Sequence, residues 1–218
     1  MKSPVKWVGS KKWLPYHIDV AKVLGSKSTY FEPFIGGGSI FFHFEPKKSM
    51  IGDSNPDLVI FYRMLKDRFP ELIDRLETYE NNSKNKAAYY KIRAFNPDET
   101  RMEDPDRAAR FFYILKLCFN GVWRVNSKGE CNSPWGYRPH VNVCPKEELL
   151  QAHRVLNKTK VKIQNMDYIE MAEYASEGDV IYFDPPYLPV SDTADFTGYT
   201  NEKFYHEDHE NLLELCSE

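Results

Sequence analysis

The chain has 218 residues, of which 42 % are hydrophobic, and it carries a net charge of −3. This length suits one large domain, or one domain with an insertion. No apolar run approaches the roughly 20 residues that a membrane span needs, and the first residues lack the apolar segment of a secretory signal. We therefore expect a cytoplasmic protein that has no membrane partner.

The charge is unevenly distributed along the chain. Residues 192–218 hold eight acids and one lysine, so the rest of the chain carries +4, and residues 110–140 hold five basic residues and one acid. A phosphate backbone responds to such a local basic patch rather than to the total charge. Charge alone does not distinguish a nucleic-acid surface from an ordinary solvated face.

The cysteines and histidines give no strong metal or disulfide signal. The four cysteines form no CxxC pair, so we expect reduced thiols. His206 and His209 lie three residues apart among acids, a spacing at which metal ligation is conceivable. Acids that favour a helix start explain this segment better, and we expect no metal.

The N-terminal part of the chain predicts two strand–helix units. Residues 29–32 suit a short strand, residues 33–39 a glycine-rich loop, and residues 40–44 the start of a helix. A second strand is expected at 48–52, and the Asn55-Pro56 pair is typical of a helix start.

The remaining elements follow in a similar order around a less regular middle. Residues 120–145 are rich in Gly, Pro, Asn and Trp and predict an irregular segment. Strand–helix alternation at both ends, around a helical and loopy middle, predicts an α/β sheet domain with an insertion. We expect helices at 87–95, 105–119, 146–156 and 206–215, strands at 160–164 and 179–183, a sheet domain from 1–55 and 146–218, and an insertion at 56–145.

Two features of the first units suit a nucleoside-containing ligand. The glycine cluster Gly36-Gly37-Gly38 lets a ligand approach the backbone closely, although many such clusters are plain tight turns. It is not a phosphate-binding P-loop, because no Gly-Lys-Ser/Thr follows. Asp53 ends the second predicted strand, where an acid can accept hydrogen bonds from both ribose hydroxyls. A helix cap or turn residue is the alternative for Asp53.

The segment Asp184-Pro185-Pro186-Tyr187 follows the predicted strand at 179–183. In open α/β sheets, ligands bind beyond the carboxyl ends of the strands. The two prolines stiffen the loop and remove two N–H donors. A carboxylate, an unopposed carbonyl and an aromatic ring suit a planar ligand that bears an amino group.

This set of groups favours methyl transfer to an aromatic amine. The lone pair of the adenine amino group is delocalised into the ring, so the nitrogen is a poor nucleophile. Acceptors at the Asp184 carboxylate and the Pro185 carbonyl would hold its two hydrogens and turn the lone pair toward a methyl donor. One such electrostatic contact supplies on the order of 3 kcal/mol.

These segments together resemble the Dam-type DNA adenine methyltransferases, which use S-adenosylmethionine. The segments that carry the resemblance are residues 6–11 (KWVGSK), 32–39 (EPFIGGGS), 53–55 (DSN), 184–187 (DPPY) and 196–199 (FTGY). The resemblance implies a Rossmann-like class I S-adenosylmethionine methyltransferase sheet with a mainly helical DNA-recognition insertion.

The resemblance also implies roles for individual residues. Asp184, Pro185, Pro186 and Tyr187 would form the catalytic segment, with Tyr187 stacked on the target base. The cofactor would contact Trp7, Lys11, Pro33, Phe34, Gly36, Asp53 and Asp184. Taken alone, Trp7 suits a core tryptophan equally well, and Lys11 a solvated lysine.

Residues 119–136 resemble the family's target-recognition hairpin. Double-stranded DNA is the implied partner, and the target adenine must be flipped out of the duplex to reach the catalytic segment. Arg124 is suited to grip guanine, and Phe119 to wedge into the base stack, although core packing is the alternative for Phe119. We expect DNA contacts from Lys6, Phe119, Asn120, Val122, Arg124, Asn126 and Pro134.

Some departures from the family pattern affect specificity. Cys131, Ser133 and Trp135 stand where members that read GATC usually have aromatic or aliphatic residues. GATC is still the site we expect, and the sequence does not distinguish a restriction-linked role from a housekeeping one.

The family continues with further strands after the helix at 206–215. We therefore expect an incomplete sheet, a truncated form with weak or absent activity on its own, and a place for a second polypeptide that completes the sheet. A methyltransferase acting on another amine is disfavoured, because those families commonly begin the tetrapeptide with Ser or Asn. A non-catalytic DNA-binding remnant is the other alternative.

Overall fold

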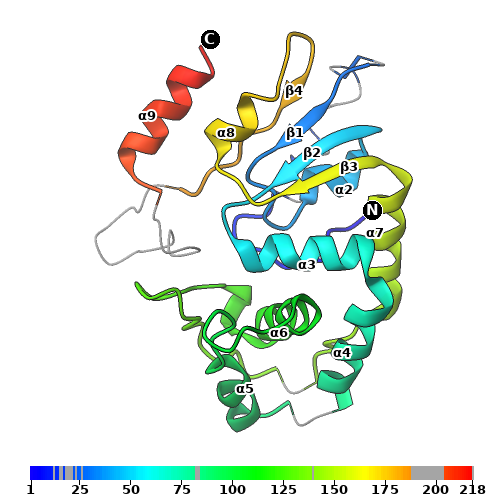
Figure 1. The fold of residues 1–218 in the computed structure, drawn as a ribbon, viewed down its shortest axis with the longest axis vertical. Helices are drawn as coiled ribbons and strands as arrows, with labels where there is room; N and C mark the ends of the chain where they lie inside the picture. Colours follow the sequence, from blue (N-terminus) through cyan, green and yellow to red (C-terminus); the bar gives the residue numbers. More distant parts are fainter. Residues whose placement is uncertain are drawn as a thin grey trace.

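The computed structural model describes residues 1–11, 13–14, 17, 22, 24–25, 27–81, 84–138, 140–187 and 204–217. The predicted FTGY segment at 196–199 lies outside these residues. Among the described residues, no helix is long and apolar enough to cross a membrane. Figure 1 shows a sheet with helices stacked beneath it and further helices beside it.

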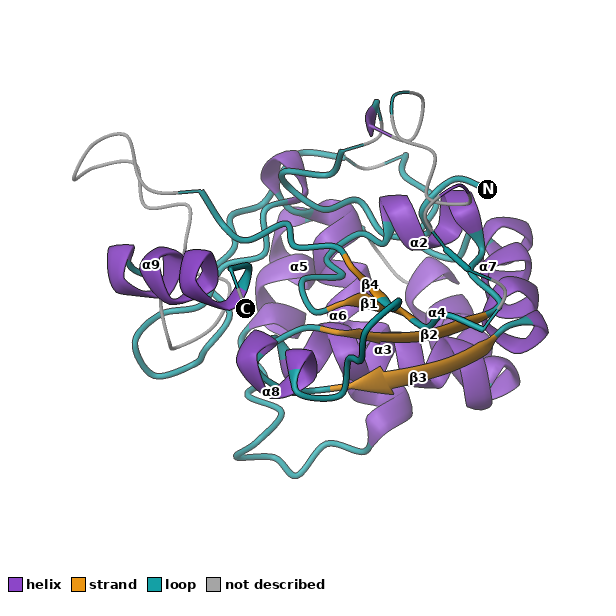
Figure 2. Cartoon of the chain, turned by 90° about the horizontal axis from the view of Figure 1, so that it is seen from above, coloured by secondary structure: helices purple, strands orange, loops and turns teal. Residues whose placement is uncertain are grey.

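The sheet has four parallel strands in the order β3-β2-β1-β4, as Figure 2 shows. From β1 the chain moves outward through β2 and β3, and then returns to the opposite side of β1. The strand order therefore reverses between β1 and β4, and ligands of open α/β sheets bind at such a point. The strands are β1 (Tyr30–Glu32), β2 (Lys48–Gly52), β3 (Lys160–Gln164) and β4 (Val180–Ile181).

Three helices share one apolar core with the sheet. They are α2 (Ser39–Phe44), α3 (Pro56–Asp67) and α7 (Lys146–Lys158), and their apolar side chains join Ile51 of β2 and Val161 of β3. The start of α3 is fixed locally, because the Asn55 side chain accepts a hydrogen bond from Leu58 N and Pro56 occupies the first turn.

The opposite face of the sheet carries a smaller apolar cluster. Met171 of α8 (Tyr168–Ala172) packs on Phe31 and Met50. The last described helix, α9 (His206–Leu215), is joined to α8 by a hydrogen bond from the Tyr168 hydroxyl to the Asp208 carbonyl.

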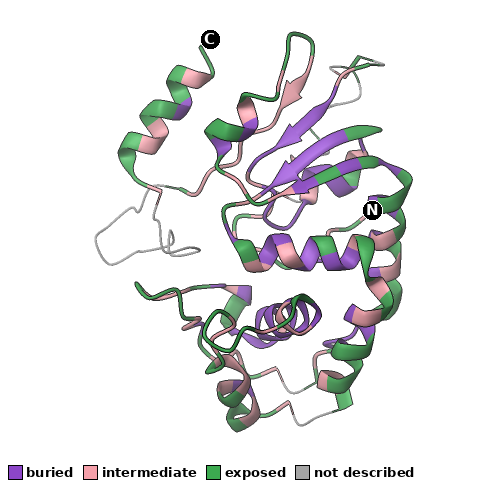
Figure 3. Cartoon of the chain, viewed as in Figure 1, coloured by how far each residue is buried: buried purple, intermediate pink, exposed green. Residues whose placement is uncertain are grey.

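The middle of the chain forms a helical layer on the far side of α3. It contains α4 (Phe69–Asn81), α5 (Lys86–Arg93), α6 (Asp104–Leu117) and the short 3-10 turn η2 (Phe119–Gly121). In Figure 1, α3 lies between the sheet and α6, and Figure 3 shows that α6 is largely buried whereas α9 is largely exposed. Since α3 contributes to the core beneath the sheet, the insertion boundary at 56–145 stays a prediction.

Most predicted elements are confirmed. The strands at 48–52 and 160–164 and the helix at 206–215 have the expected bounds. β4 is shorter than predicted and forms ladder pairs only at Val180 and Ile181. The helix α8 was not predicted. All four cysteines have free thiols, as expected.

Candidate active site

The glycine turn after β1 adopts a conformation that only glycine adopts easily. Gly36 has φ +44° and Gly38 has φ +71°. The turn lies against the carboxyl end of β2, because Ile35 N donates to the Gly52 carbonyl at 2.8 Å. A Cβ on Gly36 would stand 2.7 Å from Cδ1 of Trp7. The structure thus places Trp7 directly on the backbone of the glycine turn.

Asp53 and the glycine turn are joined by hydrogen bonds. One carboxylate oxygen of Asp53 accepts from Gly36 N at 3.1 Å, and the other accepts from Asn55 N at 3.0 Å. Asn165 Nδ2 donates to the Asp53 carbonyl at 2.8 Å. Burial raises the pKa of Asp53 to about 6, although the two N–H donors act in the opposite direction. Asp53 is therefore a carboxylate fixed beside the turn.

Lys11 and Asp184 form the ion pair at the centre of the site. Lys11 Nζ lies 2.6 Å from Asp184 Oδ1 and 4.7 Å from the ring centroid of Tyr187, and it donates to the Gly9 carbonyl at 3.1 Å. Burial alone would lower the pKa of Lys11, but hydrogen bonds to Asp184 and Tyr187 outweigh it and raise that pKa. The N-terminal motif and the catalytic segment, predicted separately, are brought together here.

The catalytic segment leaves β4 at the point where the strand order reverses. Tyr182 N donates to the Phe31 carbonyl at 2.9 Å, which continues the alignment with β1 as far as the residues before Asp184. Pro185 and Pro186 are half-buried, whereas 62 % of Tyr187 is exposed. An exposed ring beside a fixed carboxylate can receive a planar ligand.

An aromatic cluster lies beside the cofactor residues predicted from the sequence. The ring of Phe34 stacks on Tyr168 with centroids 5.4 Å apart and meets Phe204 edge-on at 5.6 Å. Phe183, just before the catalytic segment, lies 6.5 Å from Phe34. Pro33 is buried at the start of the turn. These contacts join α8 and the segment before α9 to the site, which sequence reasoning did not anticipate.

Sequence analysis also missed Glu32 as a site residue. It ends β1, is only 2 % exposed, and accepts a hydrogen bond from the Tyr30 hydroxyl at 2.9 Å. Burial raises its pKa to about 8; the Tyr30 hydrogen bond opposes this shift and the negative charge of Asp184 adds to it. An acid that closes a buried strand was the available signal, because an unpaired buried charge is costly.

The predicted recognition residues lie on a short antiparallel hairpin after α6. Isolated bridges pair Cys118 with Trp135 and Val125 with Cys131. Phe119 N donates to the Pro134 carbonyl at 2.9 Å, so these two residues lie side by side at the hairpin base.

Four of the hairpin residues predicted to contact DNA are exposed. Phe119 is 55 % exposed, which argues against the core-packing alternative for this residue. Asn120 is exposed with φ +53°, and Val122 is half-buried. The Arg124 guanidinium is exposed and its Nε donates to Asn132 Oδ1 at 2.7 Å. Pro134 is exposed.

Two further predicted DNA residues have structural contacts. The Asn126 side chain holds the hairpin turn, since its Oδ1 accepts from Lys128 N and its Nδ2 donates to Glu130 Oε2. Exposed Lys6 packs its aliphatic chain against Gly121, where a Cβ would lie 3.0 Å from Lys6 Cδ. The N-terminal motif therefore touches the hairpin base as well as the catalytic segment.

The positions that depart from the family pattern face inward. Ser133 is fully buried; its hydroxyl accepts from Arg124 N at 2.9 Å and its carbonyl accepts from the Tyr89 hydroxyl at 2.9 Å. The Trp135 ring lies 5.2 Å from Tyr89 of α5. These contacts attach the hairpin to the helical layer.

The strand order, the glycine turn after β1 and the acid after β2 define a class I methyltransferase fold. The chain belongs to the D12 class N6 adenine-specific DNA methyltransferase family, whose profile matches residues 7–218. This confirms the resemblance drawn from the motifs, and the protein is an adenine-specific DNA methyltransferase.

Named relatives agree with this family. The chain is 39 % identical over 206 residues to the type II methyltransferase M1.LlaDCHI of Lactococcus lactis subsp. cremoris, covering 93 % of this chain and 72 % of the relative. It is 33 % identical over 223 residues to the type II methyltransferase M.MjaIII of Methanocaldococcus jannaschii, covering 95 % and 76 %. It is 30 % identical over 214 residues to the DNA adenine methylase of Escherichia coli K12, covering 97 % and 74 %.

Proposed function

We propose that this protein transfers a methyl group from S-adenosylmethionine to the N6 amine of a flipped adenine in double-stranded DNA. The observation that carries the proposal is the Lys11–Asp184 ion pair at 2.6 Å, beneath the exposed ring of Tyr187. It joins the N-terminal motif to the catalytic segment at the reversal point of the sheet, where a ligand of this fold binds.

The residues around the glycine turn fit the methyl donor. Gly36 leaves its backbone open to a ligand except where Trp7 covers it, and Asp53 presents a fixed carboxylate suited to ribose hydroxyls. Phe34 and Pro33 supply apolar surface for the nucleoside, and Lys11 encloses the site from the N-terminal segment. When bound, S-adenosylmethionine supplies an electrophilic methyl group on a sulfonium.

The catalytic segment activates the amine through hydrogen bonding. The Asp184 carboxylate and the Pro185 carbonyl accept the two hydrogens of the adenine amino group, so its lone pair turns away from the ring. Tyr187 stacks on the base, a contact worth about 1–3 kcal/mol. On transfer, the methyl carbon would exchange its bond to the donor sulfur for a bond to the nitrogen, which leaves the donor as a neutral thioether. The nitrogen would release one proton to solvent, and Asp184 need not be the final acceptor.

The hairpin would extract the base and read the site. The exposed Phe119 ring is suited to fill the gap left by the flipped adenine, at an unstacking cost of a few kcal/mol, and Asn120 to support the orphaned partner base. Arg124 would grip guanine, and Lys6 would add a guanine contact. Val122 and Pro134 would touch a thymine methyl group, which fits a GATC site.

Calorimetry with S-adenosylmethionine, followed by methyl transfer to adenine-containing duplex, tests the activity. Asp53→Ala should weaken cofactor binding, whereas Asp184→Ala should lower transfer by about 10²–10³-fold. A protein that binds duplex DNA but not S-adenosylmethionine would support the alternative of a non-catalytic DNA-binding remnant.

A separate digest tests the recognition site. DNA exposed to the protein should become resistant at GATC to an endonuclease that is blocked by adenine methylation. Arg124→Ala should lose about 1–3 kcal/mol of base discrimination. Protection confined to other sequences would refute GATC and leave methyl transfer intact.

A further inference from the structure

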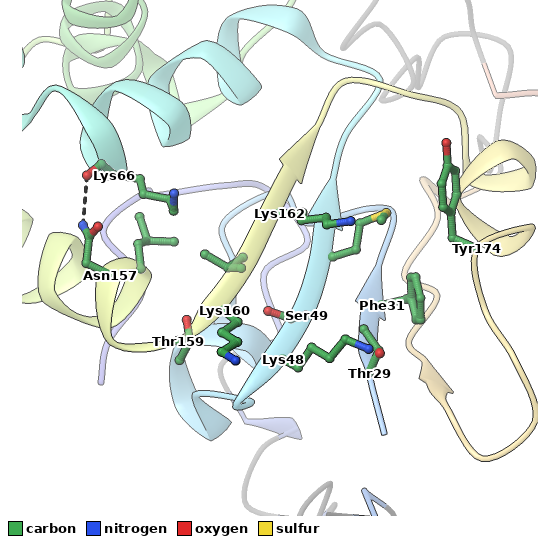
Figure 4. A pocket seen from close by; sticks show the side chains of 13 residues that line it. Thr29, Phe31, Lys48, Ser49, Lys66, Asn157, Thr159, Lys160, Lys162 and Tyr174 are labelled. Carbon is green, nitrogen blue, oxygen red and sulfur yellow. Dashed lines mark hydrogen bonds between the residues drawn. The ribbon is translucent and has the colours of Figure 1, made fainter. Parts of the chain in front are cut away.

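A groove of about 510 Å³ lies at the amino ends of β1, β2 and β3, where Thr29 precedes β1 and Lys48 and Lys160 begin β2 and β3 (Figure 4). The candidate active site lies at the carboxyl ends, so the groove is a separate cavity. Its volume is within the range of about 300–1,000 Å³ that is usual for small-molecule sites.

The charge of the groove is positive. Lys48, Lys160, Lys162 and Lys66 line it, and no Asp or Glu is among the lining residues. Lys48 and Lys160 stand directly opposite each other on neighbouring strands, an arrangement of like charges that destabilises a sheet. Lys66 pairs with Asp67, but no ion pair in the described part of the chain involves Lys48, Lys160 or Lys162.

One carboxylate on the neighbouring loop, that of Asp179, is already engaged. Asp179 accepts hydrogen bonds from Thr29 N at 2.6 Å and from Ser176 N at 3.1 Å. It therefore holds the entry to β4 rather than neutralising the lysines. A bound anion would relieve the repulsion between Lys48 and Lys160.

Ser49 lies on the opposite face of the sheet from the lysines. It pairs with Tyr30 and Val161, whose side chains belong to the core beneath the sheet. Met50, the next residue, pairs with Lys162 and belongs to the cluster on the other face. Ser49 is 2 % exposed, and its hydroxyl has no hydrogen-bond partner among the described residues, but a ligand on the lysine face does not contact this hydroxyl.

The two ends of the groove differ in chemistry. Figure 4 shows Lys66 and Asn157 at one end, and Phe31 and Tyr174 at the other. Tyr174 is 55 % exposed, so its ring is accessible for stacking. Lysines joined to an aromatic platform are the combination that binds a phosphate together with an attached base.

We propose that this groove binds a phosphate-bearing ligand, with the phosphate on Lys48, Lys160 and Lys162 and an attached ring on Tyr174. A free nucleotide and the phosphodiester backbone of a nucleic acid share this chemistry. The groove is remote from the catalytic segment, so its ligand is neither the target adenine nor the methyl donor.

Titration with thymidine diphosphate and with a thymidine octanucleotide tests the proposal and separates the two sources. Neither probe contains adenine, so neither resembles the target base or an adenosine cofactor. Binding of the diphosphate alone would identify a nucleotide, and binding of the octanucleotide alone would identify a backbone. Binding of both would establish the shared phosphate chemistry.

The key variant is Lys48→Gln with Lys160→Gln, and its control is Lys86→Gln with Lys146→Gln. The control removes the same charge from exposed positions on α5 and α7. The key variant should weaken binding by about tenfold or more at 100 mM salt, and should reduce the salt slope for the octanucleotide by about 1.4. Equal losses in both variants, or no binding of either probe to the wild-type protein, would overturn the proposal.

Ser49→Ala is a control on the other face of the sheet. Removing an unpaired buried hydroxyl should leave the unfolding midpoint unchanged or higher, and binding of both probes should be unchanged. Arg124→Ala on the hairpin should also leave binding of both probes unchanged. If Arg124→Ala abolishes binding while the Lys48 and Lys160 variant does not affect it, the probes bind at the hairpin and the groove is not their site.

Discussion

Lys11 and Asp184 are 173 positions apart in the sequence, yet Lys11 Nζ lies 2.6 Å from Asp184 Oδ1. The contact holds the N-terminal segment over the point between β1 and β4 where the strand order reverses. Because Lys11 also lies over the Tyr187 ring, one ammonium group orients both the acid and the aromatic side chain of the catalytic segment.

Lys11→Met should therefore impair the reaction more than the fold. The side chains of the ion pair are only partly exposed, at 17 % for Lys11 and 24 % for Asp184. Losing the cation misplaces the carboxylate, and a misplacement of about 1 Å can lower turnover by about 10²-fold. Methyl transfer and the unfolding midpoint should be measured together. Lys2→Met, at an exposed position nearby, should change neither, and a Lys11 variant with normal transfer would contradict the assignment.

Gly36→Ala should destabilise the protein and weaken cofactor binding. The new methyl group would meet Trp7 Cδ1 at 2.7 Å, and φ is +44° at this position. The left-handed backbone alone costs about 1–2 kcal/mol for an L-residue. Gly178→Ala is the matched control, because Gly178 has φ +87° with nothing within 4 Å of its added Cβ. Denaturant unfolding should show a larger loss for Gly36→Ala, and equal losses would mean that the Trp7 contact is unimportant.

Glu32 should make stability fall as pH rises. Burial raises its pKa from 4.5 to about 8, so the folded state holds a proton that the unfolded state has lost. The stabilisation is fully present below pH 4.5 and is lost progressively up to about pH 8, at no more than about 1.4 kcal/mol per pH unit. Urea unfolding between pH 5 and pH 9 measures this loss.

In the upper half of this pH range, the change in the free energy of unfolding comes from Glu32 and not from Asp53. The pKa of Asp53 is raised only to about 6, so its own contribution has been lost before pH 7. Glu32→Gln should flatten the stability curve between pH 6 and pH 8. Glu207→Gln, at an exposed carboxyl on α9, should leave the slope as it is. A Glu32→Gln curve with the wild-type slope would show that Glu32 ionises normally.

Phe119→Ala should impair base flipping and leave the stability of the fold almost unchanged. Phe119 is 55 % exposed, so its truncation should change the unfolding free energy little. Base flipping should weaken, which a duplex carrying 2-aminopurine at the target position reports as a smaller rise in fluorescence. Trp123→Ala, at a residue of the same hairpin that is 2 % exposed, should instead cost about 3–5 kcal/mol of stability. A strongly destabilised Phe119→Ala would favour a packing role.

Sequence patterns predicted β2 and the β4 segment well because each contains a short apolar run that is followed by a distinctive residue. Gly52 and Asp53 mark the end of β2, and the prolines after Asp184 mark the end of the β4 segment. Helix α8 was missed because it has only five residues, too few for a periodic pattern. Its position depends on Met171 packing on Phe31 and Met50, which is a tertiary contact.

The candidate site was predictable as a set of motifs and not as an arrangement. Nothing in the local sequence joins Lys11 to Asp184 or Lys6 to Gly121, because both contacts depend on the path of the N-terminal segment over the fold. Glu32 was overlooked because its raised pKa depends on burial among residues distant in the sequence. The inward-facing Ser133 and Trp135 looked like changes in base reading, whereas their contacts lie with the helical layer.

Trp7, which covers the glycine turn, lies 6.3 Å from the ring of Phe111, and Phe111 in turn lies 4.7 Å from Trp123 of the hairpin. Trp7 on the glycine turn and Trp123 in the hairpin thus contact the same side chain of α6. Attempts to retarget such an enzyme to new sequences should therefore vary the outward rim of the hairpin and leave its inward tryptophan untouched. Otherwise a redesign of base choice will also disturb the glycine turn, where we propose that the methyl donor binds.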